Sequence, residues 1–213
     1  MSAAIPTLTT PRLILRPLDL TDVDAVQALF PRWEIVRFLA THVPWPYPAD
    51  GALTFIRDIA LPAMQQGAGW HWSIRPKAAP EQLIGAINVS DKPDDNRGFW
   101  LDPAWQGQGL MSEASVAAND YWFETLERPV LRVSKAVANI PSRRISEHSG
   151  MRVIKTEHRD YVSGRLPEEV WEITREEWRR RPRQTFAALR DRPGACLCET
   201  MPALIPARRA PPG

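Results

Sequence analysis

The chain has 213 residues, of which 44% are hydrophobic and 24% are charged, and its formal net charge is +2. This composition is typical of a single globular domain and excludes a largely disordered chain. No apolar run approaches the roughly 20 residues that a membrane-spanning helix needs. Residues 1–10 lack the basic start and apolar stretch of a secretory signal, and two cysteines cannot make a disulfide framework. We therefore expect a cytoplasmic protein.

The positive charge is concentrated at the C-terminus. Residues 176–213 contain eight arginines and four acidic residues, so this segment carries +4 and residues 1–175 carry −2. No sustained hydrophobic period follows residue 178. We expect a domain over residues 1–178 and a mobile Arg- and Pro-rich extension over residues 179–213. The charge distribution argues against a domain that binds nucleic acid.

The hydrophobic pattern predicts a strand, then helices, and then a run of strands. The first predicted elements are a strand at 12–16, a helix capped by Thr21, a helical piece at 34–40 and a helix at 52–66 that Pro62 interrupts. The next are three strands at 70–74, 83–89 and 98–101. Because the connections between these three strands are short, they predict an antiparallel meander.

The order of elements changes after residue 101. The next predicted elements are a helix at 109–126, a strand at 130–137, a helix capped by Asn139 and ending before Gly150, and strands at 152–162 and 170–174 around a Ser163-Gly164 turn. A strand, helix and strand in succession imply a parallel pair of strands joined by a right-handed crossover.

One stretch combines a strand end, a glycine-containing turn and the start of a long helix. The strand ends at Leu101, and Gly107 and Gly109 precede the helix. Glycines let the backbone approach a ligand closely, and the first amides of a helix point together. With the helix dipole, this arrangement suits a pyrophosphate. A plain strand-to-helix turn explains the two glycines equally well, and the order of the surrounding elements favours the anion site.

At this stretch the chain resembles the GCN5-related N-acetyltransferase (GNAT) superfamily, most closely its Rim-type subgroup, which includes ribosomal-protein N-terminal acetyltransferases. The family's phosphate loop has Gln or Arg, two residues, Gly, one residue, and then Gly or Ala. Gln106, Gly109 and Met111 occupy these positions. The last position departs from the pattern and requires the Met111 side chain to turn away from the cofactor.

Three further segments carry the resemblance. They are Gly98 to Pro103 before the loop, Asn139 to Ser142 as an Asn-x-x-Ser element, and Glu147 to Met151 at the end of the second helix. The resemblance covers roughly residues 8–175. It implies an α+β (mixed α/β) fold with a mostly antiparallel sheet of about seven strands, helices on both faces and a splayed parallel pair of strands. It also implies direct acyl transfer from acetyl-CoA to an amine, without a covalent enzyme intermediate.

The resemblance further implies the residues of the site. The cofactor-binding residues are expected to be Phe99, Trp100, Leu101, Gln106, Gly107, Gln108, Gly109, Leu110, Met111, Ser112, Asn139 and Ser142. Amides from Gly107 to Ser112 are expected to bind the pyrophosphate, and the Leu101 amide to polarise the thioester carbonyl. Asn139 is expected to bind the pantetheine arm. Ser142 either donates a proton to the leaving thiolate or simply satisfies the helix N-terminus.

The general base is less defined, because two positions that serve in relatives carry serine here. Ser146 stands where many relatives have a tyrosine acid, and Ser134 stands where some have a carboxylate base. The remaining candidates for the base are Glu34, His71 and Asp91. Each also has a structural interpretation: a solvated helix acid, a partly exposed strand histidine and a turn residue before Pro93.

The predicted function is therefore an N-acetyltransferase, an acyltransferase that transfers groups other than amino-acyl groups. The acceptor could be a protein N-terminus, a polyamine, an amino sugar or another small amine, and a longer donor such as succinyl-CoA is also compatible with the sequence. The alternative is a non-catalytic CoA- or peptide-binding regulatory module of the same fold. We expect a monomer or homodimer.

Two groups of residues leave further alternatives open. Trp45 and Tyr47, in a loop with three prolines at 42–50, either line an acceptor pocket or cover the edge of the core. Cys196 and Cys198 lack nearby His or Cys partners, whereas a structural metal site needs about four ligands. We therefore expect no metal site.

Overall fold

The computed structural model describes residues 5–182. Beyond residue 182, the extension predicted for residues 179–213 lies outside the described residues, as do Cys196 and Cys198, and the division into domain and extension stays a prediction. The last described element is helix α7 (Arg175–Arg180), which crosses the predicted boundary at residue 178. Within the described residues, no helix is long and apolar enough to cross a membrane.

Five antiparallel strands form the first sheet, in the order β1-β2-β3-β4-β5. They are β1 (Leu8–Thr9), β2 (Leu13–Pro17), β3 (Gly69–Pro76), β4 (Gly85–Ser90) and β5 (Arg97–Leu101). The predicted meander is confirmed by β3, β4 and β5, which pair in succession. Successive side chains of β3 alternate between the two faces of the sheet. Trp72 contacts Tyr121 on one face, and His71 contacts Phe55 on the other.

A second antiparallel sheet has the strand order β6-β8-β7. Its strands are β6 (Val130–Ala136), β7 (Arg152–Tyr161) and β8 (Gly164–Thr174). The last strand begins at Gly164 and not at the predicted residue 170. The sequence pattern missed this part because it contains Pro167, Glu168 and Glu169. The two carboxylates fit the strand because Tyr161 donates to Glu168 and Arg143 pairs with Glu169.

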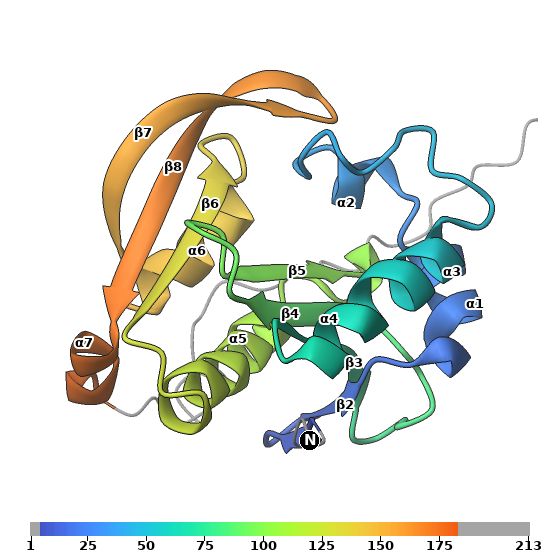
Figure 1. The fold of residues 1–213 in the computed structure, drawn as a ribbon, viewed down its shortest axis with the longest axis horizontal. Helices are drawn as coiled ribbons and strands as arrows, with labels where there is room; N and C mark the ends of the chain where they lie inside the picture. The colour runs from blue at the N-terminus through green and yellow to red at the C-terminus, as the bar shows by residue number, and fades with distance from the viewer. Residues whose placement is uncertain (1–4, 183–213) are drawn as a thin grey trace, which may run out of the picture. The chain divides into compact units, whose positions relative to one another are not determined.

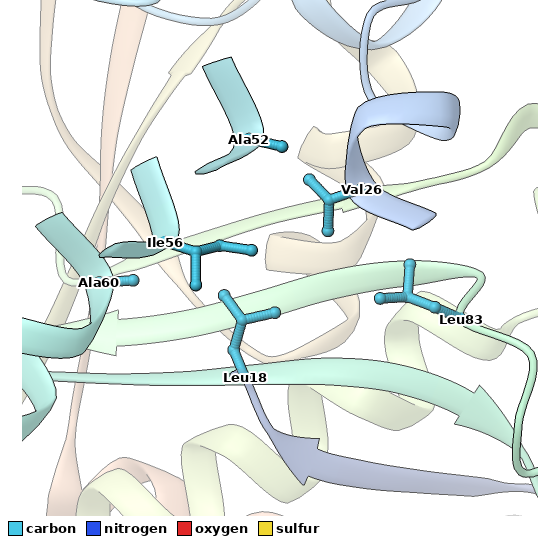
Figure 2. Packing of buried hydrophobic residues seen from close by; sticks show 6 residues of the cluster. All are labelled: Leu18, Val26, Ala52, Ile56, Ala60 and Leu83. Atoms are coloured by element: carbon cyan, nitrogen blue, oxygen red, sulfur yellow. The ribbon is translucent and has the colours of Figure 1, made fainter. Parts of the chain in front are cut away.

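Six α-helices precede α7 in the described part of the chain. They are α1 (Val23–Leu29), α2 (Trp33–Val36), α3 (Gly51–Phe55), α4 (Leu61–Gln66), α5 (Leu110–Asp120) and α6 (Ile140–His148). In Figure 1, α1, α3 and α4 lie on one face of the sheet and α5 lies on the other. The six side chains in Figure 2 fill the layer between the first group and the strands: Leu18, Val26, Ala52, Ile56, Ala60 and Leu83. The predicted fold class is confirmed.

Two local features differ from the sequence prediction. Thr21 is not the N-cap of the first helical segment: the Asp19 carboxylate accepts a hydrogen bond from the Thr21 N–H at 2.7 Å, so Asp19 is the cap. Pro62 does not interrupt its helix. A wide π-helical segment (Ile56–Ala60) precedes Pro62, and α4 follows this segment directly, so the chain stays helical through the proline.

The two sheets meet where Asn96, just before β5, contacts Arg132 of β6. The Asn96 N–H donates to the Arg132 carbonyl (2.7 Å), and the Arg132 N–H donates to Asn96 Oδ1 (2.8 Å). Beyond this joint no ladder connects the two strands, which belong to separate sheets. The splayed pair implied by the family resemblance is therefore present. We call the gap between residues 97–101 of β5 and residues 132–136 of β6 the slot, and its end at Asn96 the closed end.

Candidate active site

The edge of β5 that faces the slot carries backbone N–H groups that point away from β4. The Asp102 N–H donates to the Ile84 carbonyl at 2.8 Å, so these opposed residues form a hydrogen-bonded pair. Opposed residues of an antiparallel ladder alternate between bonded and non-bonded pairs. Phe99 and Leu101 are therefore in non-bonded pairs with β4. Their N–H groups point toward β6, so they can donate to a ligand between the strands.

The opposite wall of the slot follows the same rule. The Arg175 N–H donates to the Pro129 carbonyl at 2.9 Å, so the odd-numbered residues of β6 pair with β8. The backbone groups of Ser134 and Ala136 consequently face β5. A chain with amide groups of its own can hydrogen-bond to both walls of the slot, as an added strand does.

The loop beyond β5 has the open geometry that an anion requires. Gly107 and Gly109 have φ values of 75° and 73°, a region that side chains disfavour. A Cβ on Gly107 would meet nothing within 4 Å, and one on Gly109 would meet only Arg12 Nη2, at 3.6 Å. Gly109 is the N-cap of α5, whose first N–H groups have no intrahelical partner. The backbone of this loop can therefore approach a phosphate closely.

A buried carboxylate fixes the loop against β2. Glu113, in the first turn of α5, has no exposed surface. It accepts hydrogen bonds from Thr10 Oγ1 (2.6 Å), the Arg12 N–H (2.8 Å) and Arg12 Nε (2.6 Å). Arg12 Nη1 also donates to the Gln108 carbonyl at 2.9 Å. These contacts hold the loop and α5 in one geometry and place a guanidinium beside Gly109.

The remaining loop residues have different surroundings. Gln106 Nε2 donates to the Leu101 carbonyl at 2.9 Å and so ties the loop to the end of β5. Met111 departs from the family's pattern, but its side chain is buried and leaves the loop surface to its backbone. Leu110 is buried as well, and Ser112 is half-buried.

A cavity of about 1040 Å³ opens at the slot. Phe99 and Trp100 of β5, Lys135 of β6, and Asn139 and Ser142 of the α6 start line it, with the segment from α1 to α3 on the other side. The cavity therefore brings together four of the predicted cofactor-binding residues: Phe99, Trp100, Asn139 and Ser142. Leu101 and the loop Gln106–Ser112 lie outside its lining, next to it along the chain.

Helix α6 starts as predicted, and its cap faces the cavity. The Asn139 side chain accepts a hydrogen bond from the Ser142 N–H at 3.3 Å, and Gly150 follows the helix with φ 75°. Ser142 Oγ accepts from Lys135 Nζ at 3.1 Å. This contact leaves the Ser142 hydroxyl proton free to point elsewhere, which a proton donor requires.

Asn139→Ala is expected to weaken acyl-CoA binding and to lower the free energy of unfolding by about 1 kcal/mol, the usual value of a lost cap. Calorimetric titration with CoA and urea unfolding measure the two effects. Asn139→Ser is the matched control, since serine caps helices as well as asparagine and should restore stability but not affinity. An unchanged stability in the alanine variant would contradict the cap.

The three sequence-based candidates for the base have different surroundings. Glu34 of α2 is exposed and does not line the cavity. Asp91 lines it but forms a 2.7 Å ion pair with Arg128. His71 lines the cavity, where burial and the nearby Lys92 charge lower its pKa to about 4. His71 is therefore neutral near pH 7 and a weak base.

Sequence reasoning missed Asp95, a partly buried carboxylate of the cavity wall. Burial raises its pKa, although Arg159, the Ser134 backbone N–H and two lysines act in the opposite direction. A raised carboxyl pKa is what a general base needs to take a proton efficiently near neutral pH. Asp95 stands in the segment 92–96, which the sequence marks only as a turn, so no pattern distinguished it from its exposed neighbour Asp94.

The loop at 42–50 contributes one of its two aromatic residues to the cavity. Tyr47 lines it and contacts Phe30, whose ring also contacts Trp100. Trp45 is 43% exposed and packs on Trp33. The pocket interpretation therefore fits Tyr47 better than Trp45. Within residues 5–182, no group of three or more His, Cys, Asp or Glu side chains is arranged to hold a metal ion.

Several solved acetyltransferase structures share the fold of this chain. RimL, a ribosomal L7/L12 alpha-N-protein acetyltransferase solved with coenzyme A, is 18% identical, with a TM-score of 0.68 over 81% of this chain and 98% of that one. RimJ of Mycobacterium smegmatis, solved with CoA-disulfide, is 16% identical, with a TM-score of 0.71 over 82% and 90% of the chains. An acetyltransferase of Agrobacterium tumefaciens is 24% identical, with a TM-score of 0.64 over 81% and 96%.

These similarities show the fold alone, and the family is assigned from the sequence. No curated protein matches this chain in sequence. The family model described as an acetyltransferase (GNAT) domain, however, matches residues 12–152, which include β2 to β6 and the glycine loop. Because this match spans well over half of the sequence, the chain belongs to the GNAT acetyltransferase family.

Proposed function

We propose that the protein transfers an acetyl group from acetyl-CoA to a primary amine by direct attack in a ternary complex. The observation that carries this proposal is the slot: two strands diverge beside a glycine loop, and the N–H groups of Phe99 and Leu101 point into the gap between them. A pyrophosphate at the loop and a pantetheine arm in the slot would use these groups. Family membership makes acyl-CoA the donor; acetyl as the acyl group is our proposal.

The residues that would hold acyl-CoA fall into three groups. Backbone N–H groups from Gly107 to Ser112 suit the pyrophosphate, with the Arg12 guanidinium nearby. The walls of the slot suit the amide groups of the pantetheine arm. Asn139 stands at the cavity end of α6 and offers an amide nitrogen, because its oxygen caps the helix.

Acyl-CoA supplies an activated thioester carbonyl when it is bound. The N–H groups of Leu101 and Phe99 point into the slot, where they can stabilise negative charge that develops on a carbonyl oxygen. Asp95, on the cavity wall, can accept the proton that an ammonium must lose before it is nucleophilic. Ser142 Oγ can donate its proton to the departing sulfur, since Lys135 already donates to that oxygen.

The size of the cavity supports an acceptor larger than ammonia or a simple alkylamine. Its volume of about 1040 Å³ lies at the upper end of the range for pockets that enclose drug-sized ligands. Trp100 and Tyr47 line the side that faces α1 and α3, away from α5 and the glycine loop. We therefore place the amine on this side, and a protein N-terminus is the acceptor we favour.

Two measurements test the proposed function. Calorimetric titration with acetyl-CoA should give a dissociation constant well below about 1 mM, and no binding at that concentration would overturn the proposal. Thiol release followed with DTNB should be positive for at least one member of a panel of N-terminal peptides, polyamines and small amines. An acceptor-free blank corrects for Cys196 and Cys198. Binding without turnover across the whole panel would instead support a regulatory module.

A further inference from the structure

Arg97 carries a buried positive charge without a counter-ion in the described part of the chain. The residue is part of the cavity wall and is 3% exposed. Nη1 donates to Asn119 Oδ1 at 2.8 Å. Nε and Nη2 find no acceptor within residues 5–182, and neither does the nearby amide nitrogen of Asn119. Hydrogen-bond donors thus outnumber acceptors at this point of the cavity wall.

Lys135, on the opposite wall of the slot, is a second buried basic residue. It is 5% exposed, lines the cavity and forms no ion pair among the described residues. Its Nζ lies 5.4 Å from the centre of the Phe99 ring, and the Arg97 guanidinium carbon lies 5.7 Å from the same centre. Both basic groups therefore lie close to one aromatic ring of β5.

Two basic side chains buried close to one another are energetically unfavourable unless an anion pairs with them. Burial lowers the pKa of Arg97 to about 10, so the guanidinium still carries its charge near pH 7. Burial, followed by the charge of Arg97, lowers the pKa of Lys135, and Asp95 offsets this only in part. A buried charge is normally paired, because desolvation without a partner is costly. A carboxylate between the two side chains would satisfy both.

The position of Arg97 along the slot indicates which part of the acyl-CoA donor could carry the carboxylate. The CoA phosphates belong to the loop beyond Leu101, at the open end. Arg97 is the first residue of β5, near the closed end, roughly 7 Å from Phe99 at the usual strand rise. If the thioester carbonyl lies at the N–H groups of Phe99 or Leu101, the acyl chain extends from it toward the closed end. An acyl group of about four carbons then spans the distance from these N–H groups to Arg97.

We propose that Arg97 and Lys135 form a carboxylate-binding subsite for the acyl group, so that the protein, besides acetyl-CoA, accepts short dicarboxylic acyl-CoA donors of the succinyl class and prefers them over uncharged donors of equal length. This inference rests on the proposed function. In the transfer, the amine nitrogen bonds to the thioester carbonyl carbon, the carbon–sulfur bond breaks, and CoA leaves as the thiol with one proton from the amine. The distal carboxylate is unchanged.

The test uses two CoA thioethers that resist hydrolysis, S-(3-carboxypropyl)-CoA and S-butyl-CoA, which differ only in the terminal group. Calorimetric titration of the full chain should show at least about tenfold tighter binding of the carboxylate ligand, since charge-assisted hydrogen bonds are strong. Arg97→Met and Lys135→Met should each reduce this preference, and Arg97→Lys should keep part of it. Lys92→Met, which removes an exposed lysine of the same cavity, should leave it unchanged.

The outcomes separate this inference from the proposed function. Equal or weaker binding of the carboxylate ligand, with S-butyl-CoA still bound, overturns the subsite and leaves the acyl-CoA site standing. Binding of neither ligand overturns both. A preference that persists in Arg97→Met and in Lys135→Met also overturns the subsite, provided that circular dichroism shows both variants to be folded.

Discussion

Gly109→Asp is expected to lower the affinity for CoA at least about 100-fold, with the fold retained. Gly109 has a φ of 73° and is the N-cap of α5, beside the N–H groups proposed to bind the pyrophosphate. A carboxylate there repels a phosphate and fills the space that its oxygens need. Aspartate also tolerates this backbone region better than most residues, so the strain is modest. Calorimetric titration measures the affinity.

Gly67→Asp is the matched control for this substitution. Gly67 ends α4 with a φ of 67°, close to the value at Gly109, but it is far along the chain from the glycine loop. The same backbone strain is therefore introduced without a charge at the proposed phosphate site. The control should bind CoA as the wild type does. If Gly109→Asp also bound CoA normally, the pyrophosphate would have to lie elsewhere.

Asp95→Asn is expected to lower kcat at least about 100-fold while the KM for acyl-CoA changes little. The proposed role of Asp95 is to accept the proton of the attacking ammonium, and general-base catalysis typically contributes factors of this size or more. The amide of asparagine has nearly the same shape but cannot accept that proton. Steady-state kinetics with the acceptor identified by the amine panel provide the measurement.

The pH profile distinguishes this role from a structural one. The base works only as the carboxylate, so activity should rise as pH increases through the pKa of Asp95. Because burial raises this pKa, the rise should occur at a higher pH than for an ordinary aspartate. Asp95→Asn should lose this limb of the profile, and Asp94→Asn, which changes an exposed neighbour, should keep it. An unaltered limb in Asp95→Asn would assign the base to another group.

The parts of the fold that sequence alone could predict are those with local signals. The alternation of Trp70, His71 and Trp72 specified a strand and its two faces, and the Asn139 cap fixed the start of α6. Gly107 and Gly109 stand in the backbone region that glycine favours, as expected of a phosphate loop. Each of these features depends on residues within a few positions of one another.

What the sequence left open depends on contacts between distant segments. Asp95 is distinguished from Asp94 only by burial, which requires β6 and β7 to pack nearby. The buried basic residues of the slot are a partial exception. Leu131, Val133 and Lys135 occupy the same face of β6, so a lysine replaces an apolar residue in the pattern. That Arg97 lies beside Lys135 required the pairing of the two sheets at Asn96.

The joint at Asn96 affects how selectively the protein binds the acyl group and the pantetheine arm of an acyl-CoA donor. Its hydrogen bonds to Arg132 connect β5 and β6 at one end, so any rotation of one sheet against the other moves the residues near the joint least. Leu101 and Ala136, several residues further along, move most. An acyl tail bound near the joint therefore lies between nearly rigid walls. The pantetheine arm lies where the distance between the two strands can change. Selectivity for the transferred group should accordingly exceed selectivity for its carrier.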